Sequence, residues 1–287
     1  MTESADMDPV LTSIVQMVLG VTTMSMNFPI LLTIVTSNNL KRQKDLLVIG
    51  FLSLADMNYA LCGLLAAIYR YKTSRNSEAN KVEYVNYCAT QYFMIMIVIM
   101  YQICPLAEIC LSLDRIFAVF APIRYRLFTT NSLIMIFVYI FIYAIMGTII
   151  CILYTYFSPQ FLISPLCYLA TSVSPNVARY LTGFRFCGNL ICVILYCPVF
   201  VKILMIIKNP QILHSSIEKS QSRKIIRTSL IIGLLVAIDL VLLVIPDAIL
   251  TFDIFGMTQY ASTLYLLNIS KSLANAIVVF STSSDIR

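Results

Sequence analysis

Long apolar stretches alternate with short polar segments along the whole chain. A helix needs about 20 mainly apolar residues to cross the roughly 30 Å of hydrocarbon in a bilayer. Seven stretches are long enough to span it with some tilt, and they cover residues 10–36, 46–69, 88–118, 132–156, 180–207, 225–252 and 259–281. The pattern therefore predicts an all-α membrane protein, folded as a seven-transmembrane helix bundle.

The composition agrees with a chain that is embedded in a bilayer. Hydrophobic residues make up 59% of the 287 positions and charged residues 12%, and the mean hydropathy is +0.85. Soluble domains carry about 25% charged residues. Seven crossings leave only short loops, and the sequence has no metal-ligand spacing, phosphate-binding glycine loop or nucleophile–histidine pair. We therefore predict neither an enzyme nor a bound metal or cofactor.

The distribution of basic residues predicts the orientation of the chain. If the amino terminus is outside, thirteen of the twenty Lys and Arg residues fall on the cytoplasmic side, as the positive-inside rule requires. The outer loops then hold five: Arg70, Lys72, Arg75, Lys81 and Arg179. The first nine residues carry three acids and no base, so they lack the basic start of a cleaved signal peptide. We expect a short extracellular amino terminus over residues 1–9, one membrane domain over 10–281 and a very short cytoplasmic tail over 282–287.

The net charge of +6 is scattered over short loops and forms no basic stripe with interleaved aromatic residues. A nucleic-acid partner is therefore not predicted.

An acidic and a basic residue are adjacent at the end of the third apolar stretch. Asp114 and Arg115 precede Pro122, Arg124 and Arg126. Charges at a membrane boundary are costly to place unless they are paired, although an arginine at a helix end often extends simply to reach water. We predict that Arg115 has a second, conditional partner and that the pair acts as a switch facing the cytoplasm.

Asp56 lies inside the second stretch, where an ionised carboxylate needs partners from other helices. The best candidates are Asn27 on the first stretch and Lys271 and Asn275 on the seventh, the last two sharing a helix face because they are four residues apart. This core polar network is either a packing cluster or an ion-pair switch, and a buried pair can do either job.

Further ionisable residues lie within the predicted spans. Glu108 and Asp239 fall toward the inner half, where we expect them to hydrogen-bond as neutral groups to neighbouring helices, in preference to forming a proton-sensitive network. Arg185 and Asp247 are better placed to line an outer ligand cavity among the third, fifth, sixth and seventh spans.

Prolines interrupt the third, fifth and sixth apolar stretches. Pro198 and Pro246 each delete a backbone hydrogen bond and can act as pivots for the cytoplasmic ends of the fifth and sixth spans. Pro105 predicts a kink or bulge in the third span.

Taken together, the chain resembles the rhodopsin-like seven-transmembrane receptors that couple to heterotrimeric G proteins, and it is most similar to nematode serpentine chemoreceptors of the srsx kind. The resemblance covers nearly the whole chain. It is carried by Asn27, Leu54-Ala55-Asp56, Cys88, Ser112-Leu113-Asp114-Arg115-Ile116, Pro122, Pro198, Pro246 and Asn275. The chain departs from that family in having no Trp, in Ile116 where a Tyr is usual, and in Ala276 where a Pro is usual.

The resemblance implies roles for particular residues. Asp114 holds Arg115 in the resting form, and Arg115 contacts the G protein in the active form, on an inner surface that includes Pro122, Arg124 and the basic loop before the sixth span. A disulfide between Cys88 and Cys167 is implied on the outer side.

Two ligand types common in this family are not expected here. Amine receptors carry an Asp five turns before the motif Arg, about 18 residues, and Ile97 stands at that position. Opsins place the retinal lysine six residues before the Asn of the seventh span, whereas Lys271 is four before Asn275. A retinal cofactor is therefore not predicted.

The function implied by the resemblance is that of a chemosensory receptor for a small molecule or short peptide, located in the plasma membrane or in a sensory cilium. Its partners would be a heterotrimeric G protein, the ligand and membrane lipid. The alternative is a multi-pass transporter or proton-coupled carrier, since charged residues within spans also line ion paths. The inverted repeats that would support a carrier are not visible in the sequence.

Overall fold

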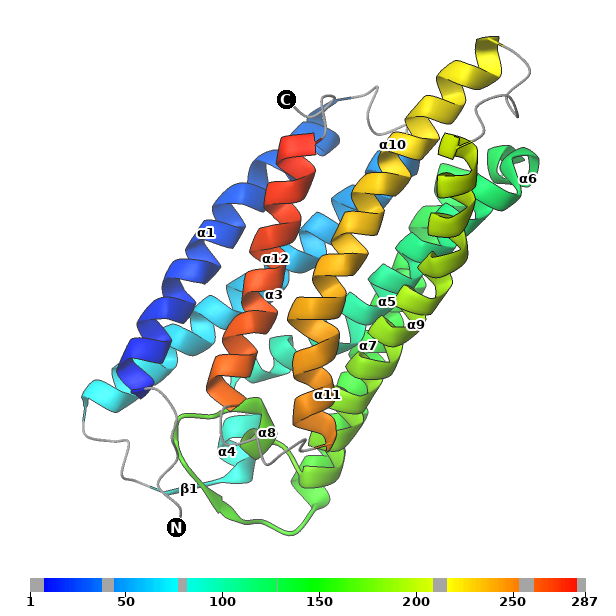
Figure 1. Cartoon of the computed structure of the whole chain (residues 1–287). Helices are drawn as coiled ribbons and strands as arrows, with labels where there is room; N and C mark the ends of the chain where they lie inside the picture. Colours follow the sequence, from blue (N-terminus) through cyan, green and yellow to red (C-terminus); the bar gives the residue numbers. More distant parts are fainter. Residues whose placement is uncertain are drawn as a thin grey trace.

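The computed structural model describes residues 8–37, 44–76, 82–127, 129–208, 216–252 and 261–282. Its long helices pack side by side into one elongated bundle (Figure 1). Seven helical segments of the described chain are long and apolar enough to cross a membrane. The predicted seven-transmembrane helix bundle is confirmed, and the protein is an integral membrane protein by this criterion.

The spans follow the order of the sequence. Six are single helices, and the sixth span is made of three consecutive segments: α1 (Pro9–Thr36), α3 (Lys44–Arg75), α5 (Tyr92–Phe120), α7 (Thr130–Phe157), α9 (Pro175–Lys208), α10 (Ser216–Asp239) with η3 (Leu240–Val244) and α11 (Ile245–Phe252), and α12 (Ala261–Thr282).

Short elements close the two ends of the bundle. One end, here called the disulfide end, holds β1 (Glu83–Tyr84), α4 (Val85–Ala89), β2 (Leu162–Ile163) and α8 (Leu169–Ser172). The two strands pair antiparallel, with Glu83 opposite Ile163. The other end, here called the Arg115 end, holds α6 (Pro122–Leu127).

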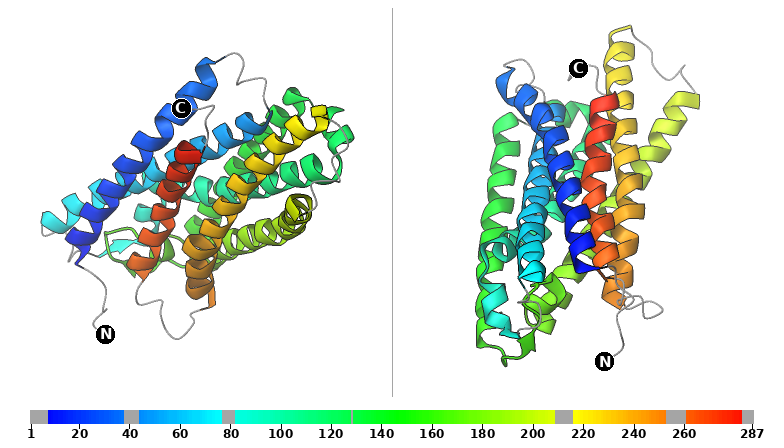
Figure 2. Two further views of the ribbon diagram at one scale, coloured as in Figure 1. Left: turned by 45° about the horizontal axis from the view of Figure 1, so that its top comes forward. Right: turned by 90° about the vertical axis from the view of Figure 1, so that its left-hand side faces the viewer.

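Helix α1 begins at the disulfide end and α12 finishes at the Arg115 end, as an odd number of crossings requires (Figure 1, Figure 2). Which end faces the cytoplasm remains a prediction from the distribution of basic residues. Residues 1–7, 209–215 and 283–287 lie outside the described chain, and with them most of the predicted amino-terminal segment, part of the basic loop and most of the tail.

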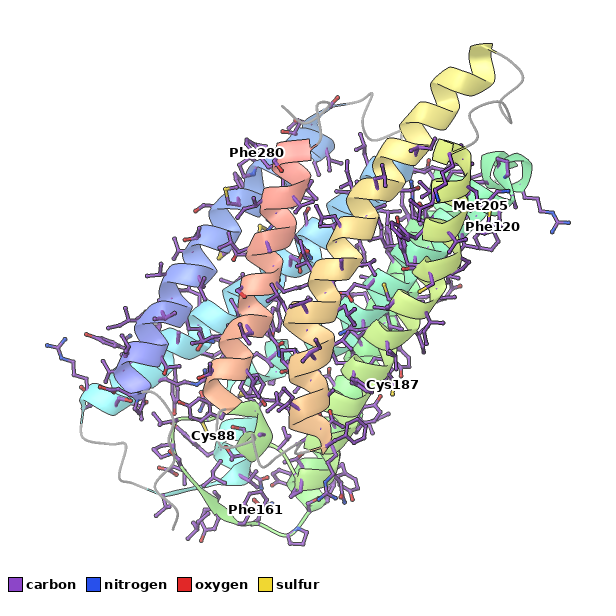
Figure 3. The ribbon with its side chains drawn as sticks, viewed as in Figure 1. Cys88, Phe120, Phe161, Cys187, Met205 and Phe280 are labelled. Atoms are coloured by element: carbon purple, nitrogen blue, oxygen red, sulfur yellow. A yellow bond between two sulfur atoms is a disulfide. The ribbon has the colours of Figure 1, made fainter. Side chains whose placement is uncertain are left out.

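Helix α5 is the centre of the bundle. In its most apolar window 67% of the residues are buried, against 22% for α7 at the periphery. Large apolar side chains instead cover the outside of the bundle along its length (Figure 3), including Phe120, Met205 and Phe280, all more than 40% exposed. Contact with lipid requires such an apolar outer surface. The candidate functional side chains are therefore those inside the bundle, where α5 packs against its neighbours.

The third apolar stretch differs from its prediction as a single run over 88–118. Cys88 belongs to α4, and the chain breaks at Gln91, whose extended backbone (φ −63°, ψ 133°) caps the start of α5. The fifth span also begins earlier than predicted, at Pro175, because proline suits the first turn of a helix. Arg179, expected in an outer loop, therefore lies within α9.

The irregular turn lies in the sixth span, whereas the third span, where a kink or bulge was expected at Pro105, is assigned as one α-helix. Pro105 lies inside a continuous α5, close to α9, where a Cβ added to Gly188 would stand 2.6 Å from Pro105 Cβ. The irregular turn is η3, a π-helical segment immediately before Ile245 and Pro246. Such wide turns insert one residue into a helix and occur frequently at functional sites.

Candidate functional site

Arg115 is completely buried near the end of α5, with 0% of its side chain exposed. Its Nε donates a hydrogen bond to Asp114 Oδ2 at 2.9 Å, and its Nη2 forms an ion pair with the same oxygen. The other carboxylate oxygen, Oδ1, accepts a hydrogen bond from the Tyr125 hydroxyl at 2.9 Å. The arginine is thus held against its own helix by a neighbour whose two oxygens are both engaged.

Tyr125 is a contact that the sequence did not single out. It lies on α6, where Lys44 Nζ donates to its backbone oxygen at 3.0 Å and lies 5.3 Å from the centre of its ring. Helix α6 is thereby fastened to the start of α3 and to Asp114 at once. Pro122, the first residue of α6, and Arg124 were predicted to belong to the switch, and both are exposed. The residue of α6 that contacts the Asp114–Arg115 pair is Tyr125. No chemical signal in a basic run distinguishes the tyrosine.

A second cluster lies deeper, around Lys271 on α12, which is buried. Lys271 Nζ is 2.5 Å from Glu108 Oε1 of α5, 3.4 Å from Asp239 Oδ1 of α10 and 3.7 Å from Asp56 Oδ1 of α3. Buried charges are tolerated only when they are paired and hydrogen-bonded. One ammonium group therefore joins four helices.

Asp56 takes further hydrogen bonds from α12. Ser272 Oγ donates to Oδ1 at 2.9 Å, and Asn275 Nδ2 donates to Oδ2 at 3.4 Å. Asn27 instead donates its side-chain amide to Thr23 O of its own helix at 3.0 Å, and no hydrogen bond joins it to Asp56 in the described part of the chain. Of the predicted partners, Lys271 and Asn275 meet Asp56 and Asn27 does not, while Ser272 is an addition.

Glu108 and Asp239 differ from their expected role as separate, neutral hydrogen-bonding groups. Both are ion-pair partners of Lys271, because the long lysine side chain reaches the third and sixth spans from the seventh. With Asp56 the cluster gathers three carboxyl groups around one ammonium. The sequence placed these residues at similar depth but gave no indication that they share a partner.

An apolar layer separates the Lys271 cluster from Arg115. Along α5, Glu108 and Arg115 are about 10 Å apart at 1.5 Å per residue, and Leu111 lies between them. The layer combines α5, α9, the sixth span and α12, and its buried members include Leu111, Tyr196, Val199, Ile232, Val236 and Ala276. Tyr196 also donates its hydroxyl to the backbone oxygen of Ser229, which links α9 to α10.

Arg185 and Asp247 form the third group of buried charges, nearer the disulfide end. Arg185 Nε donates to Asp247 Oδ2 at 2.7 Å and its Nη2 pairs with Oδ1, so the contact is bidentate. Asn268 Nδ2 donates to the same carboxylate at 3.2 Å, and the guanidinium lies 3.9 Å from the centre of the Tyr101 ring. Its Nη1 donates to the Tyr59 hydroxyl at 3.3 Å. The two residues predicted to offer charges to a ligand satisfy each other instead.

The cavity at the disulfide end also differs in position from the prediction. It is lined by residues of α1, α3, α5, α8 and α12, including Gln16, Tyr59, Ile97 and Tyr265, and its volume is about 40 Å³. Ile97 lines this cavity, and Arg185 lines a second, smaller one of about 20 Å³. None of the described residues that line the first cavity comes from the fifth or sixth span, whereas the second cavity is lined by Arg185 of the fifth and Leu243 of the sixth.

The disulfide end itself is fixed covalently. Cys88 of α4 is joined to Cys167, which precedes α8, with their Cα atoms 5.3 Å apart; Figure 3 places Cys88 at this end, together with Phe161 of the facing loop. The other seven cysteines are free thiols. The disulfide ties the segment between α7 and α9 to the start of the third span.

Pro198 and Pro246 lie at the predicted positions within the fifth and sixth spans. Pro198 is inside α9, and Pro246 follows η3 directly. The π-helical turn and the proline together interrupt regular backbone hydrogen bonding just beyond Asp239.

Neither the protein-family models nor the curated proteins compared with the chain give a match. The fold defines an integral membrane protein with seven membrane-spanning helices, and what it does must be argued from the residues inside the bundle.

Proposed function

We propose that the protein is a G protein-coupled receptor that binds a small molecule or short peptide at the disulfide end and activates a heterotrimeric G protein at the Arg115 end. The observation that carries the proposal is that Arg115 is buried and paired with Asp114. A fully buried guanidinium at the end of the central helix is held by Asp114, and Asp114 is held in turn by Tyr125. These contacts are reversible, so a tilt of the surrounding helices can expose the arginine to a partner.

The three buried charge layers provide a route from one end to the other. The Arg185–Asp247 pair joins the fifth and sixth spans, and the Lys271 cluster joins the second, third, sixth and seventh. Both layers include the sixth span, on either side of η3. A ligand that favours one arrangement of these pairs shifts the population toward it, by no more than its difference in affinity for the two states.

The sixth span is the element that moves in this proposal. Pro246 and η3 weaken its backbone hydrogen bonding at one depth, so the segment from Ser216 to Asp239 can tilt about that point. Its contact with α9 through Tyr196 and Ser229 lies on the Arg115 side. Tilting would open that side next to Arg115.

The distribution of basic residues supports an outside amino terminus, and the proposed location is the plasma membrane or a sensory cilium, with membrane lipid covering the apolar surface. The proposed ligand is not a biogenic amine held by an acid on the third span, because Ile97 occupies that position and lines the cavity.

The proposal is tested in cells that carry a calcium or cyclic-nucleotide reporter and are challenged with a small-molecule panel. An active compound should lose its effect when Arg115 is replaced by Ala at equal surface expression. Arg75→Ala is the matched control, since Arg75 is an exposed arginine at the other end of the bundle. A wild-type response from Arg115→Ala would refute the role of this residue.

A proton-coupled carrier is the second candidate, favoured by the three carboxyl groups around Lys271, because ionisable residues within the membrane mark proton paths. Counterflow uptake in proteoliposomes separates the two. Uptake that disappears in Glu108→Gln, without any G protein present, would favour the carrier.

A further inference from the structure

Arg70 is a buried cation whose partners are all neutral. It lies on α3 at the disulfide end and is 7% exposed. Its Nε donates to Leu166 O at 3.1 Å, its Nη1 to Gln16 Oε1 at 3.0 Å and its Nη2 to Cys167 O at 3.2 Å. Within the described chain no carboxylate forms an ion pair with it.

The other buried cations of the described chain differ from Arg70 in this respect. Arg115 pairs with Asp114, Arg185 with Asp247, and Lys271 with three acids. A guanidinium does not lose its proton in proteins, and an ion taken out of water is strongly penalised unless an opposite charge is near. Carbonyl and amide oxygens lower that cost but leave the charge in place. Among the described residues the positive charge of Arg70 is therefore not balanced by a negative one, although its guanidinium lies 4.4 Å from the centre of the Tyr168 ring.

Arg70 lines the cavity at the disulfide end, here called the Arg70 cavity. Three tyrosines, Tyr59, Tyr101 and Tyr265, share its wall with Gln16 and Arg70, and the remaining lining is apolar: Gly63, Ile97, Leu169 and Ile269. Its volume of about 40 Å³ holds a few water-sized groups. A small planar head group therefore fits this conformation, and a larger body would extend past the apolar residues as the bundle opens.

We infer that the Arg70 cavity binds a ligand with a single carboxylate on a small apolar body. The cavity offers one unbalanced positive charge, since Arg185 nearby is neutralised by Asp247. That balance matches a monoanion, whereas a phosphate would bring a second negative charge. Arginine presents five N–H donors in a plane that fits a carboxylate, and three of them already serve neutral acceptors that a carboxylate can replace.

The position of Arg70 also explains how such a ligand would be sensed. Two of its acceptors, Leu166 O and Cys167 O, belong to the segment that the disulfide ties to α4. Cys167 has a φ of 51°, a left-handed conformation that side chains other than glycine rarely adopt. A carboxylate that takes the donors of Arg70 releases this segment, and Tyr59 connects the cavity to Arg185. The inference rests on the proposed receptor function for its consequence, but the binding itself does not.

The test measures thermal unfolding of the full chain in lipid nanodiscs, without any G protein. The probes are acetate, butyrate, benzoate and phenylacetate, each compared with its primary amide, which has the same shape and no charge. At least one acid should raise Tm while its amide does not. In Arg70→Gln the affinity for that acid should fall by roughly tenfold or more, the loss of about 1.4 kcal/mol, whereas Arg75→Gln, an exposed arginine later in α3, should bind like the unaltered protein.

The inference is overturned if the acids raise Tm no more than their amides, or if Arg70→Gln binds the acid as tightly as the unaltered protein. Should Arg70→Gln fail to fold, the comparison of acids with amides on the unaltered chain still tests whether the protein binds a carboxylate. A carboxylate that binds but never activates a G protein would contradict the proposed receptor function and leave the site assignment standing.

Discussion

Each buried cation of this protein is held in a different way, and the differences separate residues that stabilise from residues that can switch. Arg185 is held bidentately by Asp247 from another span, and Lys271 by acids from three other helices. Arg115 is held by its own chain neighbour, Asp114, which in turn accepts a hydrogen bond from Tyr125 of the short helix α6. We therefore expect Lys271 to dominate stability and Arg115 to dominate signalling.

Replacing Lys271 with Met should destabilise the bundle strongly. The change leaves Asp56, Glu108 and Asp239 buried without a cation, and removing one member of a buried ion pair typically costs about 3–5 kcal/mol. Thermal unfolding in nanodiscs measures the loss. The double variant Lys271→Met/Glu108→Gln should recover part of it, because it also removes the acid closest to Nζ. Unchanged stability of Lys271→Met would show that the cluster does not hold the helices together.

At the scale of the elements, the packing of α5 against α9 makes one part of the bundle rigid, whereas the irregular turn in the sixth span makes another part easier to tilt. Gly188 lets Pro105 approach α9 closely, which fixes the fifth span on the central helix. The π-helical turn before Pro246 loosens the sixth span at a similar position in the bundle. The rigid pair is thus a support against which the sixth span can tilt.

The Gly188→Ala variant should lose stability by about 1–3 kcal/mol, the usual cost of overpacking, because its Cβ would stand 2.6 Å from Pro105 Cβ. Gly183→Ala is the matched control on the same helix, since nothing lies within 4 Å of its added Cβ. The control should be neutral or more stable by about 0.5–1 kcal/mol, from the higher helix propensity of alanine. Equal Tm values for the two variants would contradict the close contact between α5 and α9.

For the molecule as a whole, coupling to a G protein requires that the Arg115 end of the bundle face the cytoplasm. A disulfide persists where the surroundings are oxidising, and the end with α6 and the start of α10 carries most of the basic residues. On both grounds we predict that the disulfide end lies outside the cell. The Arg115 end would then face the G protein.

Site-directed labelling on intact cells checks this orientation. An epitope at the amino terminus should be accessible to an antibody without permeabilisation. A cysteine introduced at Arg124, an exposed position on α6, should react with a membrane-impermeant thiol reagent only after permeabilisation, against the background of the unaltered chain. The opposite pattern of accessibility would place Arg115 outside and remove the basis for coupling.

The sequence predicted the spans because crossing a bilayer demands a length and a composition that loops cannot match. It also singled out Asp114 with Arg115, which are informative on their own, while the pairing of Cys88 with Cys167 was implied by the family resemblance and is present in the structure. It did not predict contacts that depend on packing between distant helices: Tyr125 on Asp114, the shared partner of Glu108 and Asp239, or the mutual neutralisation of Arg185 and Asp247. Arg70 was counted as one of several loop charges, because nothing in the sequence shows that α3 continues to Arg75 and buries it.

The central claim is that Asp114 restrains an arginine whose release activates a G protein. It is tested most directly by measuring nucleotide exchange on a purified heterotrimeric G protein, with the protein in nanodiscs and no ligand. Asp114→Asn should raise the basal exchange rate above that of the unaltered protein, Tyr125→Phe should raise it less, and adding Arg115→Ala to Asp114→Asn should return it to background. Basal exchange that Asp114→Asn leaves unchanged, or that survives the loss of Arg115, would contradict the account.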